Sequence, residues 1–120
     1  MEATSVPWVI LTTRYGGDVE SPSPDDLSRA IAELYDARDD EEHDEVSLRR
    51  AQDEGPMVVL ALFRSGAAEL EEWEDADFET PLAPARTIRG VTREAALALC
   101  LRLAWGAVDD VRRGFAAGSS

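Results

Sequence analysis

The apolar positions of the chain change their period several times, and each period predicts an element. Residues 8–15 are rich in β-branched and aromatic side chains and predict a first strand. Residues 57–63 are continuously apolar, which is typical of a central strand covered on both faces. On either side of it, residues 46–51 and 67–73 carry further strand patterns, so the three segments together predict a meander.

The third segment of this meander carries a local irregularity. Leu70 and Trp73 differ in parity, and a bulge or a strand end near Glu71 would bring both to one face. Residues 75–84 are acidic and interrupted by proline, so we expect a loop there. Residues 87–91 predict a short strand at an edge of the sheet.

Two other segments carry the spacing of an amphipathic helix. The helix predicted for residues 24–37 follows Ser23, a favourable N-cap, and has proline at its first position. A longer helix is predicted for residues 92–113, either continuous or broken at Gly106. From residue 114 onward we expect the tail to fray.

The order of these elements predicts the fold class. A strand, a helix, three or four further strands and a final helix are typical of an α+β domain. We expect residues 1–120 to form a single α+β domain, with an antiparallel sheet of about four to five strands covered on one face by two helices. A chain of 120 residues is within the usual size of one domain.

Charge narrows the class of partner. The chain has 25 acidic residues against 12 basic ones, all of them arginine, and its net charge is -13. Such a surface repels nucleic acid and anionic lipid and attracts basic proteins, so we expect neither a nucleic-acid nor a membrane partner. A single cysteine, an N-terminus without a signal-like pattern and no long apolar run favour a cytoplasmic protein.

The residue types that usually carry catalysis are scarce. His43 is the only histidine and lies within an acidic run, which favours a surface position. Cys100 has apolar neighbours, which favours a place in the core. Neither of the two acidic runs, residues 33–45 and 69–79, has the central glycine of an EF-hand loop. We therefore expect no catalytic residues, no metal site and no cofactor.

Two acidic runs remain, and they have two interpretations. They are either solvated surface, which keeps a small protein monomeric, or a surface that binds a basic partner. The second run surrounds Trp73 with carboxylates, as an aromatic anchor in an interface would be surrounded. The candidate partner-binding residues are Glu69, Glu71, Glu72, Trp73, Glu74, Asp75 and Asp77 of this run, and Asp40, Glu41 and Glu42 of the first.

The layout of strand 8–15, helix 24–35, meander 46–73 and closing helix resembles a known family. It is similar to the small α+β immunity proteins of bacterial polymorphic toxin systems, often encoded beside deaminase toxins. The resemblance spans most of the chain and rests on layout, size and acidity. It implies a non-catalytic protein that binds one cognate toxin domain and blocks its active site or substrate groove.

Two other hypotheses stay open at this stage. One is a small regulatory or ligand-binding domain, with a pocket between the sheet and the C-terminal helix near Trp8, Tyr35 and Trp105. The weaker one is an enzyme that uses carboxylates alone, which would need a buried acidic group with a strongly raised pKa.

Overall fold

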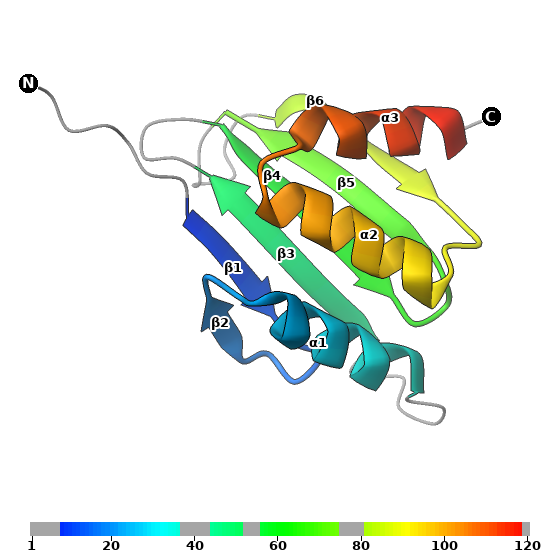
Figure 1. Ribbon diagram of the computed structural model, residues 1–120. Coiled ribbons are helices and arrows are strands. Elements are labelled where there is room, and N and C mark those ends of the chain that lie inside the picture. Colours follow the sequence, from blue (N-terminus) through cyan, green and yellow to red (C-terminus); the bar gives the residue numbers. More distant parts are fainter. Residues whose placement is uncertain (1–7, 37–43, 52–55, 75–80, 119–120) are drawn as a thin grey trace, which may run out of the picture.

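The computed structural model describes residues 8–36, 44–51, 56–74 and 81–118 (Figure 1). Within these residues the chain forms six strands and three helices. In chain order they are β1 (Trp8–Thr12), β2 (Asp18–Glu20), α1 (Pro24–Asp36), β3 (Glu45–Ala51), β4 (Met57–Phe63), β5 (Ala68–Trp73), β6 (Pro81–Ile88), α2 (Arg93–Ala104) and α3 (Val108–Gly118).

The strands form one sheet in the order β2-β1-β3-β4-β5-β6, and every neighbouring pair is antiparallel. All three helices lie on one face of this sheet (Figure 1). The α+β class and the antiparallel sheet are therefore confirmed. The predicted four to five strands and two helices are too few, because β2 was not foreseen and the closing helix is two helices.

The division of that closing helix has a local cause at Gly106. Its φ of +88° is left-handed, which glycine adopts without strain. The N–H of Gly106 donates to Leu103 O and the N–H of Ala107 donates to Arg102 O, the two bonds of a Schellman C-cap. The second part, α3, continues past the predicted end at residue 113 to Gly118, and Phe115 is fully buried.

The predicted bulge near Glu71 is not on β5. The register between β4 and β5 runs regularly from Met57 opposite Trp73 to Leu62 opposite Ala68, so Leu70 and Trp73 face opposite sides of the sheet. The register shifts fall between β5 and β6. Leu70 and Glu72 on β5 are two positions apart, whereas their partners on β6, Arg86 and Ala83, are three positions apart. The extra residue is therefore on β6.

Strand β6 begins at Pro81, so the loop predicted for residues 75–84 is wrong for its last four residues. Residues 75–80 lie outside the described part of the chain. Proline is compatible with a strand here because β6 is at the edge of the sheet, where one row of N–H groups has no ladder partner. The edge position predicted for residues 87–91 is correct, but the strand is longer and ends at Ile88.

The main core lies between the sheet and the helices. Its largest fully buried side chains include Leu11, Ile31, Leu34, Leu60, Leu103 and Phe115. Strand β4 is buried along both faces, as its continuous apolar run predicts. No helix in the described part of the chain is both long and apolar enough to cross a lipid bilayer.

Candidate functional site

The sheet has a second face, opposite the helices, which we call the open face. No described helix lies on it (Figure 1). Because successive side chains of a strand alternate, β5 divides its residues between the two faces. Ala68 and Leu70 belong to the main core, whereas Glu69, Glu71 and Trp73 are on the open face.

One end of the open face is apolar and aromatic. Trp8, Ala51, Met57 and Trp73 stand opposite one another in a single row across four strands. Met57 and Ala51 are buried, and the two indoles, each partly buried, pack against this small cluster together with Val59. Two tryptophans thus stand on the open face on either side of a small apolar floor.

Glu71 connects this aromatic row to the acidic side chains next to it. The indole N–H of Trp73 donates to Oε1 of Glu71 over 3.1 Å. Both side chains are partly exposed on the same face of β5. The hydrogen bond therefore restrains an aromatic ring and a carboxylate side by side on the open face.

Strand β3 adds a carboxylate, that of Glu45, to the open face. Partial burial raises the pKa of Glu45 on β3, and the negative charges of Asp44, Glu69 and Glu71 raise this pKa further. The charges of Glu69 and Glu71 on β5 thus act on Glu45 on β3. We call Glu45, Glu69, Glu71 and Trp73 the acidic–aromatic patch.

Glu72 does not belong to this patch, although the sequence groups it with its neighbours. Its side chain is on the helix face, and only 8% of the residue is exposed. Oε1 of Glu72 accepts hydrogen bonds from Nε and Nη2 of Arg112 on α3, at 2.8 and 2.6 Å. The structure thus separates Glu72 from Glu69, Glu71 and Trp73.

The remaining predicted residues divide into two groups. Glu74 is exposed directly after β5. Asp40, Glu41, Glu42, Asp75 and Asp77 lie outside the described residues, as does His43.

Sequence reasoning missed two contributors to the open face. Glu45 is the first residue of β3, and Trp8 was assigned to a pocket on the other side of the sheet. The alternation of apolar residues at Val46 and Leu48 could have placed Glu45 on the face opposite the core.

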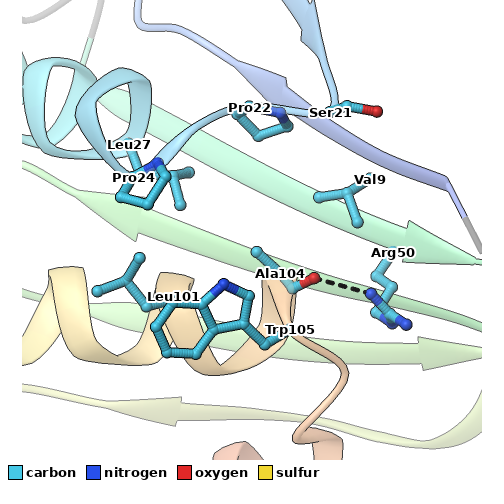
Figure 2. A pocket seen from close by; sticks show the side chains of 9 residues that line it. All are labelled: Val9, Ser21, Pro22, Pro24, Leu27, Arg50, Leu101, Ala104 and Trp105. Carbon is cyan, nitrogen blue, oxygen red and sulfur yellow. Dashed lines mark hydrogen bonds between the residues drawn. The ribbon is translucent and has the colours of Figure 1, made fainter.

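The predicted ligand pocket is present only in part. Tyr35 donates its hydroxyl to the carbonyl oxygen of Val91 over 2.9 Å, and Trp8 is on the open face. Trp105 does line a cavity on the helix side, but with a different set of residues (Figure 2). Tyr35 and Trp8 do not line that cavity.

The described residues include no group of three or more histidine, cysteine, aspartate or glutamate side chains placed to hold a metal ion. Cys100 is in the core, as its apolar neighbours predict, and burial raises the pKa of its thiol to about 12. A thiol with this pKa is almost entirely protonated and is a weak nucleophile at neutral pH.

Comparison with known protein families, with curated proteins and with solved structures gave no match for this chain.

Proposed function

We propose that this chain is a non-catalytic binding protein that places its open face on a basic surface of another protein. We further propose that this partner is a toxin domain, which the chain neutralises as an immunity protein by covering its active site or substrate groove. The observation that carries the proposal is the acidic–aromatic patch, where Trp73 and three carboxylates share one face of the sheet.

The composition of the patch suits a basic partner. A partly exposed tryptophan provides the large apolar contact that is typical of interface hot spots. The carboxylates beside it complement lysine and arginine side chains, and their mutual repulsion is relieved when a cation comes between them. The net charge of -13 steers a basic protein toward the chain from a distance.

The size of the open face also suits occlusion. Six strands spaced by about 4.8 Å span about 24 Å, and a strand of six residues is about 20 Å long. This gives a projected area of about 500 Å², of the same order as the ~800 Å² that one partner buries in a standard interface. A broad surface of this kind covers a groove rather than entering it, and its carboxylates would replace a polyanionic substrate.

The test measures association with a basic protein domain encoded beside this chain in its native genome. The variant Glu69→Arg/Glu71→Arg should lower the association rate constant about tenfold at low salt and reduce its salt dependence. The matched control is Glu33→Arg/Glu94→Arg, which makes the same change in net charge at exposed positions on the helix side. The control should change the rate less than about threefold.

Trp73→Ala tests the aromatic part of the patch. Loss of a central aromatic anchor should raise the dissociation rate about 10- to 100-fold with little change in association. If the control pair slows association as much as the patch pair does, the patch is not the docking site. If the neighbouring basic domain neither binds nor is inhibited, the immunity function is wrong.

A further inference from the structure

A cavity of about 240 Å³ opens on the helix side of the sheet, between the start of α1, β1 and the end of α2 (Figure 2). Val9 and Arg50 reach it from the sheet, and Leu101 and Trp105 from α2 and its C-cap. The cavity and the acidic–aromatic patch are on opposite faces of the sheet. An occupant of the cavity therefore leaves the docking surface free.

The charge in this cavity is opposite to that of the rest of the protein. The whole chain has 25 acidic residues, yet none of the described residues that line the cavity is acidic, and one of them is Arg50. A second cavity of about 200 Å³ borders Arg50, and its lining within the described part of the chain is also free of acidic residues. Arg50 is thus a cation that borders two cavities, and no described carboxylate lines either of them.

Arg50 retains most of its hydrogen-bonding capacity. Its Nη1 donates to the carbonyl oxygen of Ala104 over 2.9 Å, which holds the guanidinium at the C-terminal end of α2. Among the described residues, no carboxylate lies within ion-pair distance of this guanidinium, and no other acceptor bonds to it. A guanidinium has five N–H donors, so several remain for a carboxylate, which it binds well through two parallel hydrogen bonds.

The other walls are apolar, and one of them is a flat aromatic ring. Leu27 and Leu101 line the cavity together with the prolines at the start of α1. Trp105 is 72% exposed, an unusual state for so large an apolar side chain. The Schellman turn at Gly106 fixes the backbone here, and the indole of Trp105 lies at the rim of the cavity, where its face is open to a second flat group.

We propose that this cavity binds a small organic acid with a flat apolar body. Its carboxylate pairs with Arg50, and its body lies between Trp105, Leu27 and Leu101. The volume of about 240 Å³ is enough for one aromatic ring with a short acid arm. A monocarboxylate fits better than a phosphate dianion, because the net charge of -13 opposes each added negative charge and one arginine offsets only one.

Phenylacetate is the probe, and its neutral amide phenylacetamide is the matched control ligand. The indole N–H signals of the three tryptophans are followed by NMR in the full chain as each ligand is added. Phenylacetate should shift the Trp105 signal saturably, with a Kd in the millimolar range typical of a ligand of this size, and leave the signals of Trp8 and Trp73 in place. Phenylacetamide should bind at least tenfold more weakly, because it cannot pair with Arg50.

The source of the carboxylate is tested with a second pair of ligands. The peptide Gly-Gly-Phe, which ends in a free carboxylate, and its C-terminal amide are compared in the same way. Tighter binding of the free acid than of phenylacetate would assign the cavity to the C-terminus of a peptide. Weaker binding would assign it to a free small acid, and both outcomes support recognition of a carboxylate.

Arg50→Gln should weaken phenylacetate binding at least tenfold, whereas Arg102→Gln, at an exposed position of α2, should change it less than twofold. Because Arg50 also supports the end of α2, Trp105→Ala provides an independent variant at a largely exposed position and should weaken binding at least fivefold. The proposal is overturned if acid and amide bind alike, if neither shifts Trp105 saturably, or if both variants bind as the parent does. Such a result leaves the open-face proposal standing, because the two sites lie on opposite faces.

Discussion

Arg112 on α3 holds Glu72 on β5 through two hydrogen bonds to one carboxylate oxygen, at 2.8 Å from Nε and 2.6 Å from Nη2. Glu72 is the one buried charged residue in the described part of the chain. The hydrogen bond to Glu72 also raises the pKa of Arg112, so the guanidinium stays charged. The pair connects the last helix to the sheet and gives Glu72 a role in the fold.

Substitution of Arg112 and substitution of Glu72 should lower the free energy of unfolding by different amounts. Arg112→Met leaves a buried carboxylate without its partner and should lower the free energy of unfolding by about 3 kcal/mol. Glu72→Ala leaves an arginine whose side chain is 40% exposed and can turn to water, so its cost should be about 1–2 kcal/mol. Urea unfolding of both variants measures the difference, with Glu74→Ala as an exposed control that stays within about 0.5 kcal/mol. Equal costs for all three variants would contradict this account.

Gly106 allows a second prediction about the end of α2. Alanine at a positive φ costs about 1 kcal/mol in backbone strain, and at Gly90, φ +70°, a new Cβ would meet nothing else within 4 Å. At Gly106 the new Cβ would lie 3.0 Å from Nη2 of Arg50 and would disturb its bond to Ala104. Gly106→Ala should therefore cost about 0.5–1.5 kcal/mol more than Gly90→Ala, and this excess should vanish in an Arg50→Gln background. An excess that persists in that background would show that Arg50 is not its source.

Most of the fold was predictable because its signals are local. The continuous apolar run of β4 and the proline and aspartates at the start of α1 predict these elements within a residue or two. Strand β2 has three residues and one partly buried side chain, Val19, too few for a pattern. The start of β6 is not predictable from the sequence because proline is normally excluded from the interior of a sheet. Pro81 is compatible with β6 because it is the first residue of an edge strand.

The candidate site was harder to predict because it depends on register and on distant partners. The alternation along β5 could separate Glu72 from Glu69 and Glu71, but the irregularity predicted near Glu71 obscured it. Arg112, which pairs with the buried carboxylate of Glu72, is forty positions away in the sequence. Glu45 joins the acidic–aromatic patch only through the pairing of β3 with β4 and of β4 with β5.

Cys100 should be unreactive in the folded protein. Its thiol is buried, and with a pKa of about 12 only about one molecule in ten thousand is a thiolate at pH 8. An aromatic disulfide reagent should therefore fail to modify the native chain over an hour at pH 8 and should react fully within minutes in 8 M urea. Native chain that reacts as fast as unfolded chain would show that Cys100 is accessible.

The pKa of Glu45 gives a prediction about pH. Since the folded state raises this pKa above the ordinary value of 4.5, the ionised carboxylate disfavours folding. The destabilisation is absent below pH 4.5, where the group is protonated in both states, and it grows as pH rises through the folded pKa. Glu45→Gln should therefore be more stable than the parent at pH 7 and equal to it near pH 4. The gain at pH 7 should be less than about 0.5 kcal/mol, because Glu45 is only partly buried and water screens its charge.

Thermal unfolding of parent and Glu45→Gln across pH 4–8 checks this prediction, with Glu33→Gln as the control on the helix side of the sheet. Both substitutions remove one negative charge, but only Glu45 has Glu69 and Glu71 beside it. In 1 M NaCl the advantage of Glu45→Gln should shrink, because salt screens repulsion between exposed carboxylates. An equal gain for Glu33→Gln would assign the effect to net charge, and the acidic–aromatic patch would then lose its support as a cluster of interacting carboxylates.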